Sequence, residues 1–327
     1  MSQRRDFTMK IDSNYLIYEE HQDNNSAFRN AQVIMEEIHD LIRPENEKAI
    51  QAYERTMEDE MALAIFGSNY IERVGARLVD TINICKRVFA GELVDASALP
   101  PRDSEYESLL AHLRENLQVV DPGVTHVART RREIIQHAQA LQHITQAVIT
   151  RNEPFSEDLI KRTHKILCNG ISISSDNPTQ REYYSGRYRT IVVHAGSTNF
   201  TPPRFVAKQM TELVTELNDD IRKCEESNAL DPFQLAAKYS MKFVQIHPFQ
   251  DGNGRMCRLI LNALLLKYAG IVVSIGEQDK DRSEYIEICK RESEEMIGGG
   301  EFATLVLERS VTKLETLRAS IKGALGL

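Results

Sequence analysis

The helical spacing of apolar residues, which recurs along most of the 327 residues, is the feature that most constrains the fold of this chain. Apolar side chains follow one another at intervals of three and four residues, as they do on one face of an α-helix. One such series runs through Ile71, Val74, Leu78, Ile82 and Cys85. Strand-forming side chains gather in one place, between Arg181 and Pro203. The pattern therefore predicts an all-α protein that carries a single small β-hairpin.

Breaker residues divide this pattern into separate helices. Two helices are expected between residues 27 and 60, meeting near Pro44, and one helix is expected over about residues 57–90 with Gly91 as its stop. Further helices are expected over residues 108–117, 130–150, 157–167, 204–226, 232–246, 255–268, 282–297 and 302–325. Three glycines, Gly298 to Gly300, are expected to separate the last two.

The predicted hairpin follows from a local change of residue type. Aromatic and β-branched residues from Tyr183 to Val193 favour an extended arm. Residues 195–199 supply the turn, and Phe200 with Thr201 supplies the returning arm. A hairpin of this kind either takes part in binding or is an ordinary structural element with no role in binding.

Composition excludes several classes of function. A net charge of −8 and a pI near 5.7 argue against binding to a nucleic-acid backbone. No apolar stretch approaches the ~20 residues that cross a bilayer, and the N-terminus leads into no apolar signal core, so no membrane partner is expected. We expect a cytoplasmic protein, with a nuclear location left open. Five widely spaced cysteines are expected to be reduced thiols rather than zinc ligands or disulfides.

The segment from His247 to Arg258 carries the chemistry. It lies between two apolar helix stripes, so it forms a tight loop between two core helices. Pro248 disfavours helical geometry at His247 and leaves the imidazole at a helix end facing the loop. Gly252 and Gly254 allow successive N–H groups to converge at the start of the next helix, which makes an anion site.

Two arginines and an acid complete that loop. Arg255 and Arg258 lie three residues apart and so share one helical face, where they offer two guanidinium groups to separate phosphates. Asp251 provides one hard oxygen ligand for a magnesium ion that takes its other ligands from phosphate and water. The segment therefore predicts a site for a metal-bound polyphosphate with a base beside it. Asp-Gly and Asn-Gly also form simple turns, but a turn requires neither the histidine nor the arginines.

The segment resembles the signature of the Fic (Fido) family, H-P-F-x-D/E-G-N-G-R-x-x-R, at every defined position. The similarity extends to residues 186–189 and 200–203 and to Asn262, and it covers roughly residues 151–300. It implies a Fic-type helical core around a central helix-loop-helix over residues 151–300, with the hairpin as a flap. Residues 1–150 would then form an N-terminal helical region, and 301–327 a C-terminal helix.

The resemblance also implies an enzyme, a protein adenylyltransferase. Such a nucleotidyltransferase moves AMP from ATP to the hydroxyl of a Ser, Thr or Tyr side chain in a target protein and releases pyrophosphate, a reaction called AMPylation. The partners implied are ATP with Mg²⁺ and a protein target, and a homo-oligomer is compatible with the sequence. Two alternatives remain, a deAMPylase that removes AMP and a regulatory protein that binds ATP without transfer.

Residue roles follow from the same resemblance. His247 would take the proton from the attacking hydroxyl, Asp251 would hold magnesium on the α and β phosphates, and Phe249 would anchor the loop in the core. The remaining nucleotide contacts would come from an anion hole of Gly252, Asn253 and Gly254, from Arg255 on the β phosphate and from Arg258 on the γ phosphate. Tyr285 would form part of the adenine pocket or be a core tyrosine. Val192, Val193 and His194 of the flap would align the target backbone.

A pattern before the core resembles the family's inhibitory helix, S/T-x-x-x-E-G/N. It begins at Ser68 and places Glu72 one turn later on the same helix face. Glu72 would reach Arg258 and deny that arginine to the γ phosphate, which would make the enzyme autoinhibited. Arg73 departs from the Gly or Asn that the family has after the glutamate. The alternative is that Glu72 is a plain surface carboxylate.

Overall fold

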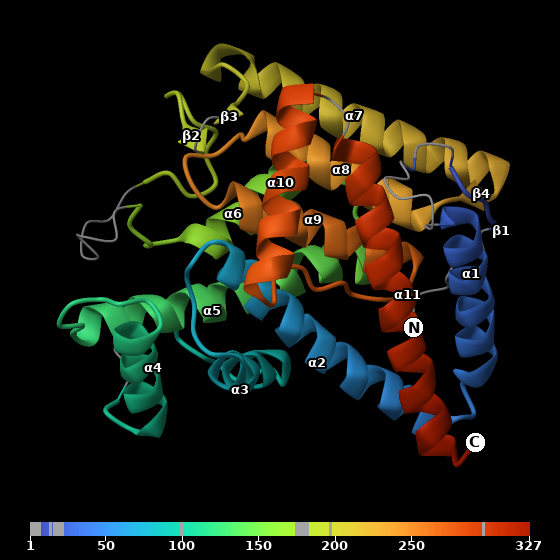
Figure 1. Ribbon diagram of the computed structural model, residues 1–327, viewed down its shortest axis with the longest axis horizontal. Helices are drawn as coiled ribbons and strands as arrows, with labels where there is room; N and C mark the ends of the chain where they lie inside the picture. The colour runs from blue at the N-terminus through green and yellow to red at the C-terminus, as the bar shows by residue number, and fades with distance from the viewer. Residues whose placement is uncertain are drawn as a thin grey trace.

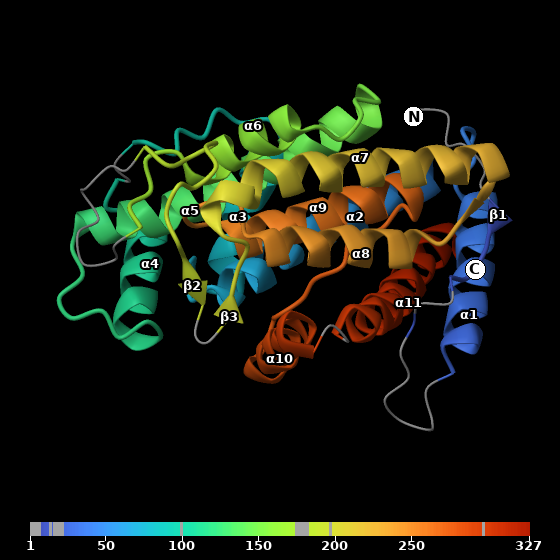
Figure 2. The same ribbon diagram turned by 90° about the horizontal axis from the view of Figure 1, so that it is seen from above.

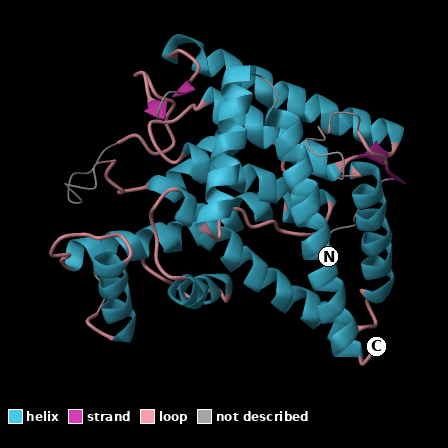
Figure 3. Ribbon diagram, viewed as in Figure 1, coloured by secondary structure: helices cyan, strands magenta, loops and turns pink. Residues whose placement is uncertain are grey.

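Helices form nearly all of the regular secondary structure in the described part of the protein, as the computed structural model shows (Figure 3). The structure describes residues 8–12, 15, 23–98, 101–173, 183–195, 198–295 and 298–327. Within these residues there are eleven α-helices, one π-helical turn and four strands of two residues each. The all-α prediction with a small hairpin is therefore confirmed. No helix in this described part of the chain is long and apolar enough to cross a membrane.

The helices follow the predicted order closely. Their bounds are α1 (Asn24–Leu41), α2 (Glu47–Ile71), α3 (Leu78–Phe89), α4 (Ser104–Glu115), α5 (Val124–Thr145), η1 (Gln146–Thr150), α6 (Glu157–Cys168), α7 (Pro203–Ser227), α8 (Pro232–Ile246), α9 (Asn253–Tyr268), α10 (Asp279–Glu295) and α11 (Gly298–Leu325). The strands are β1 (Thr8–Met9), β2 (His194–Ala195), β3 (Thr198–Asn199) and β4 (Ala229–Leu230).

The pair α8 and α9 forms the centre of the fold (Figures 1 and 2). Helix α9 is buried on almost every side, against α8, α5, α2 and α6, because its apolar residues do not keep to one stripe. Helix α7 covers α8 on one side and α11 covers it on another. The loop between α8 and α9 is therefore held by several independent helices.

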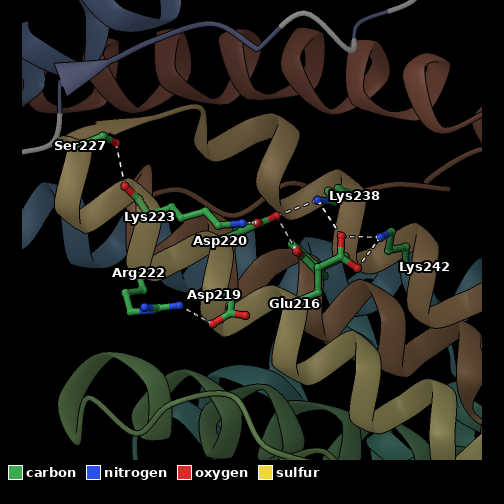
Figure 4. A network of polar contacts seen from close by, with 9 residues as sticks. Glu216, Asp219, Asp220, Arg222, Lys223, Ser227, Lys238 and Lys242 are labelled. Carbon is green, nitrogen blue, oxygen red and sulfur yellow. Dashed lines mark hydrogen bonds and ion pairs between the residues drawn. The ribbon is translucent and has the colours of Figure 1, made fainter.

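Ion pairs tie α8 to α7 along their shared edge (Figure 4). Lys242 Nζ lies 2.6 Å from a carboxylate oxygen of Glu216, and Lys238 Nζ lies 2.7 Å from Asp220. Tyr239, fully buried on α8, also donates its hydroxyl proton to Asp220 at 2.7 Å. These contacts fix the helix that leads into the loop.

The N-terminal residues join the same region. Strand β1 pairs in parallel with β4, with Thr8 opposite Ala229 and Met9 opposite Leu230. Asp231 follows β4 and caps α8 by accepting from the backbone N–H of Phe233 and of Gln234. The chain before α1 is thus attached to the connection between α7 and α8.

The single helix predicted over residues 57–90 is wrong, because the structure divides it. Helix α2 ends at Ile71 and α3 begins at Leu78. Between them Arg73 has φ +57° and Gly75 has φ +82°, backbone angles that an α-helix does not contain. The apolar spacing continues across this break, so periodicity alone could not reveal it.

The hairpin is shorter than predicted. Strands β2 and β3 pair antiparallel, with His194 opposite Asn199 and Ala195 opposite Thr198, so the predicted turn overlaps both strands. Residues 188–193 are irregular rather than extended in a sheet. The guanidinium of Arg189 donates to the carbonyl oxygens of Ile191 and Thr201 at 2.9 and 2.5 Å. The side chain thereby fills the bonds that strand pairing would otherwise make.

The glycine triplet was also misassigned. Helix α11 begins at Gly298, so the three glycines form its first turn instead of separating two helices. The amide of Gly299 donates to a carboxylate oxygen of Glu292 on α10 at 2.6 Å, which links the two helices. The predicted helix end at Ile297 lies outside the described residues.

Candidate active site

The loop between α8 and α9 is built on a sharp reversal of the backbone. His247 ends α8 in the left-handed conformation, with φ +51° and ψ +59°, and α9 begins at Asn253. Pro248 follows His247 and stops the helix there. Phe249 is fully buried, and its ring stacks on that of His164 with centroids 3.6 Å apart. The loop is therefore anchored in the core by an aromatic side chain, as predicted for Phe249.

Asn253 holds the loop closed. Its side-chain oxygen accepts from the amide of Phe249 at 2.9 Å, and its side-chain nitrogen donates to the carbonyl of the same residue at 2.8 Å. The side chain is thus engaged within the loop, so any contact of Asn253 with an anion would have to come from its backbone N–H at the start of α9. Gly252 has φ +76°, and a Cβ there would come within 2.6 Å of the Cys168 sulfur. Only glycine fits that position.

His164 of α6 contacts the loop between α8 and α9 and positions it, a role that the sequence did not indicate. Its Nδ1 accepts from the amide of Gly186 at 2.8 Å, so the proton lies on Nε2, which donates to the carbonyl of Asp251 at 2.9 Å. Burial lowers the pKa of His164 to about 4, against which the bond to Asp251 acts only in part. A neutral histidine therefore links α6, the segment before the flap and the loop.

Arg189 joins the flap to the end of α8; the resemblance included it within residues 186–189 but gave it no role. The side chain is buried, and its Nε donates to the carbonyl of His247 at 2.6 Å. Its backbone amide donates to the carbonyl of Pro248 at 2.9 Å. One buried arginine thus satisfies carbonyl groups at the helix end and in the hairpin. A buried arginine beside a helix end has no sequence signature.

His247 faces the flap in its neutral form. Its ring stacks on Phe200 with centroids 3.7 Å apart. Nδ1 lies 3.1 Å from the carbonyl oxygen of Val244. A carbonyl only accepts, so Nδ1 carries the proton and Nε2 has a free lone pair. Burial lowers the pKa of His247 to about 4, opposed by the bond to Val244 and assisted by the positive charge of Arg189.

Arg255 is a buried cation that protein groups satisfy only in part. It is 3% exposed, and its Nη2 lies 3.3 Å from a carboxylate oxygen of Asp251. Among the residues that the structure describes, its Nε and Nη1 have no hydrogen-bond partner. Buried polar groups are normally paired, so these N–H groups indicate an anion site. The Asp251 side chain itself is 39% exposed.

Arg258, one turn later on α9, contacts the end of α2. Its Nη2 lies 2.6 Å from Glu72 Oε1 and donates to the carbonyl of Ser68 at 3.0 Å, and its Nε donates to the Ser68 hydroxyl at 2.8 Å. Arg258 is 3% exposed, whereas the Glu72 side chain is 35% exposed. The structure therefore brings Ser68 and Glu72 onto Arg258, and Glu72 is not a free surface carboxylate.

Glu72 also lies against the loop. A Cβ added to Gly254 would overlap its carboxylate oxygen, so glycine at this position is what lets the acid approach the start of α9. The first N–H groups of a helix attract an anion. The carboxylate of Glu72 therefore occupies the neighbourhood that the sequence assigned to phosphate.

The other predicted site residues lie around the edge of the loop between α8 and α9. Tyr285 of α10 is buried, and Arg258 Cζ lies 5.5 Å from the centroid of its ring. Val192 is 63% exposed, His194 is exposed and Val193 is half-buried beside the hairpin. The stacking of Phe200 on His247 places the flap at the edge of the loop. The adenine and target-binding roles stay predictions.

A metal ion would have one protein ligand at this site. No group of three or more His, Cys, Asp or Glu side chains in the described ranges could hold a metal. A single exposed carboxylate, Asp251, fits an ion such as Mg²⁺ that arrives bound to polyphosphate, because that ion keeps water and phosphate ligands.

The helical fold and the loop together place a neutral imidazole and two buried arginines at one site. Residues 154–265 match the Fic/DOC family model, and the chain therefore contains a Fic/DOC domain.

Curated proteins that are named protein adenylyltransferases are similar to this chain over about half of its length. Protein adenylyltransferase fic-1 of Caenorhabditis elegans is 31% identical over 153 residues, which are 46% of this chain and 26% of that protein. Protein adenylyltransferase Fic of Nematostella vectensis is 30% identical over 155 residues, 47% of this chain and 33% of that protein. The chain thus spans between a quarter and a third of the length of these relatives.

Solved structures extend the fold similarity to most of the chain. A Fic domain containing signaling protein from Bacteroides thetaiotaomicron matches with a TM-score of 0.60 at 20% identity, covering 91% of this chain and 98% of that chain. A segment of Fic-1 from C. elegans matches with a TM-score of 0.60 at 20% identity, covering 91% of this chain and 72% of that chain. At this identity the likeness establishes the fold.

Proposed function

We propose that this chain is a protein adenylyltransferase that is inhibited by its own Glu72. The observation that carries the proposal is the pair of buried guanidinium groups, Arg255 and Arg258, at the start of α9 beside the neutral imidazole of His247. Polyphosphate supplies the negative charge that such a site requires. The names of the curated relatives support AMP as the group transferred.

His247 acts as the base in this proposal. Its Nε2 accepts the proton of the target hydroxyl while the hydroxyl oxygen forms a bond to the α phosphorus of ATP. The bond from that phosphorus to the oxygen of the β phosphate breaks, and pyrophosphate leaves. The contact of Nδ1 with Val244 sets the tautomer that this step requires.

The loop and Arg255 stabilise the charge that shifts toward the leaving group. The N–H groups at the start of α9 converge on the phosphates, and the free N–H groups of Arg255 bind the β phosphate. Asp251 would hold Mg²⁺ on the phosphates. When bound, that ion would neutralise phosphate charge.

Inhibition follows from competition for Arg258. Its Nη2 bonds to Glu72 at 2.6 Å, so the γ phosphate finds neither the guanidinium nor the space beside Gly254. ATP that binds without the Arg258 contact would place its α phosphorus away from His247. Removal of the carboxylate should therefore raise the rate of transfer.

The experiment uses the whole chain with radiolabelled ATP and MgCl₂. We expect the wild type to label itself weakly, Glu72→Gly to label strongly, and the double variant with His247→Ala to remain unlabelled. Intact mass measurement then shows the gain of one AMP. ATP binding by Glu72→Gly without any adduct or pyrophosphate would contradict transfer and favour a regulatory ATP-binding protein.

Removal of AMP is a second candidate, because the partly exposed Glu72 carboxylate lies at the loop where it could orient a water molecule. The self-labelled Glu72→Gly protein serves as substrate for this test. Wild-type chain that releases AMP from it, while His247→Ala or Glu72→Gly chain does not, would assign the deAMPylase activity. No release by any form would exclude it for this substrate.

A further inference from the structure

The end of α2, which carries Glu72, rests on the first turn of α10. Asp279, the first residue of α10, accepts two hydrogen bonds on Oδ1. The hydroxyl of Tyr70 donates one at 3.0 Å, and Arg73 Nη2 donates the other at 3.0 Å. These two donors flank Glu72 in sequence. A single carboxylate therefore holds the residues on both sides of the inhibitory acid.

Arg282 makes a third contact with the same turn. Its Nε donates to the carbonyl of Ile71 at 2.9 Å. Ile71 is the last residue of α2, and the last carbonyl groups of a helix have no partner within the helix. Arg282 thus satisfies a group that would otherwise be unpaired, one residue before Glu72.

The backbone before α10 packs equally closely on α2. A Cβ added to Gly67 would lie 2.5 Å from the carbonyl oxygen of Ile275, and one added to Gly276 would overlap the side chain of Ile71. The absence of two side chains allows the connection between α9 and α10 to lie directly on the last turns of α2 (Figure 1). This contact leaves the end of α2 little room to move toward α10.

The backbone conformation of Arg73 explains why this turn needs stabilising contacts from another helix. Its φ of +57° is a conformation that glycine and asparagine adopt readily and that other residues adopt at a cost. Its side chain lies over the Tyr70 ring, 5.3 Å from Cζ to the centroid, and reaches Asp279. The contact with α10 therefore compensates for a residue that disfavours the turn.

Helix α10 also contacts the other half of the inhibitory pair. Tyr285, two turns after Asp279, places its ring 5.5 Å from Arg258 Cζ. The same helix thus touches Arg258 through Tyr285 and holds the turn of Glu72 through its first residues.

We propose that Asp279 and Arg282, here called the α10 clamp, are positioning residues that keep Glu72 on Arg258 and so set the strength of inhibition. This inference rests on the proposed function for its activity readout, while the geometry of the turn gives a readout of its own. Asp281 is the matched control, because it lies in the same turn and pairs with Arg309 of α11 at 2.9 Å rather than with α2.

Release of the clamp should raise transfer modestly. An exposed ion pair of this kind contributes little on its own, so we expect Asp279→Ala to label itself only a few-fold faster than wild type. Asp279→Asn keeps an acceptor for both donors and should stay near wild type, and Asp281→Ala should equal wild type. Arg282→Ala should act in the same direction as Asp279→Ala. Added to Glu72→Gly, none of these changes should raise the rate further, since no inhibitory acid remains to be released.

Amide hydrogen exchange separates the clamp from the activity. Residues 70–75 should exchange faster in Asp279→Ala than in Asp281→Ala, whatever the reaction catalysed. Equal exchange and equal labelling in these two variants would overturn the proposal, as would a further rise on top of Glu72→Gly. Failure of Glu72→Gly to label would count against the proposed function, and the exchange result would then decide alone whether the clamp holds the turn.

Discussion

The guanidinium of Arg258 lies 2.6 Å from the carboxylate of Glu72, a residue 186 positions earlier in the chain. The pair joins the end of α2 to the first turns of α9, and it places the acid against Gly254, where an anion would bind. Because Arg258 is buried, its positive charge requires a partner at all times. An acid and a phosphate can therefore exchange there, and this exchange is the physical basis of the inhibition proposed above.

Graded changes of Glu72 should separate its charge from its shape. Glu72→Gln keeps an oxygen near Arg258 but removes the charge, so its self-labelling rate should fall between that of wild type and that of Glu72→Gly. Both changes should lower the free energy of unfolding by about 1–3 kcal/mol, because a buried arginine loses a charged hydrogen bond. Urea unfolding measures this. Equal labelling in all three proteins would show that Glu72 does not inhibit transfer.

The pH dependence of transfer should report the protonation of His247. Its pKa of about 4 means that the imidazole of the free protein is neutral and able to accept a proton down to that pH. In the Glu72→Gly background we expect kcat/KM to stay level from pH 8 to about pH 5 and to fall below it. An acid limb near 6.5, the ordinary value for histidine, would show that burial does not control this group.

The acid limb of kcat should lie higher than that of kcat/KM. Bound ATP places negative charge beside the imidazole, and a neighbouring negative charge favours the protonated form and raises the pKa. The two profiles, measured over the same buffers, test this ordering. The reverse order would mean that the phosphates do not lie beside His247.

The elements most accessible to prediction were those with a local signal. Helix α8 was predicted over its observed range because Pro232 begins it and Pro248 ends it beyond a clear apolar stripe. The loop was found because histidine, glycine and arginine stand in adjacent positions. The end of α2 was missed because the apolar spacing runs through Val74 and Leu78 as if the helix continued.

Residues that act across the fold gave no such signal. His164 carried no signal in the sequence, and Arg189 was noted only as part of the resemblance over residues 186–189. The roles of both depend on carbonyl groups of the loop that only the tertiary structure brings near them. The α10 clamp has the same character, since Asp279 is more than 200 positions from both of its donors. Prediction from one sequence reached the loop between α8 and α9 but not the residues that position it.

Stability should fall as the pH falls from about 6.5 toward 4, and His164 should account for part of the loss. Its pKa is lowered to about 4 in the folded chain, so between these values the unfolded chain binds the extra proton and the folded chain does not. This difference corresponds to roughly 3 kcal/mol over the window. Urea unfolding at pH 7 and pH 5 measures the part of this difference that develops above pH 5, about 2 kcal/mol, and His164→Asn should show a smaller decrease than wild type.

Replacement of Arg189 should uncouple the flap from the loop. The buried guanidinium donates to carbonyl oxygens of Ile191, Thr201 and His247, and its removal leaves these groups without that donor. We expect Arg189→Ala to lower the free energy of unfolding by about 2–4 kcal/mol and, in the Glu72→Gly background, to reduce self-labelling at least tenfold. Arg187→Ala is the matched control, because Arg187 lies two residues earlier and is exposed. Thermal unfolding and self-labelling of both variants test whether Arg189 couples the flap to the loop. An Arg189→Ala protein that behaves like Arg187→Ala would show that the hairpin is held by other contacts.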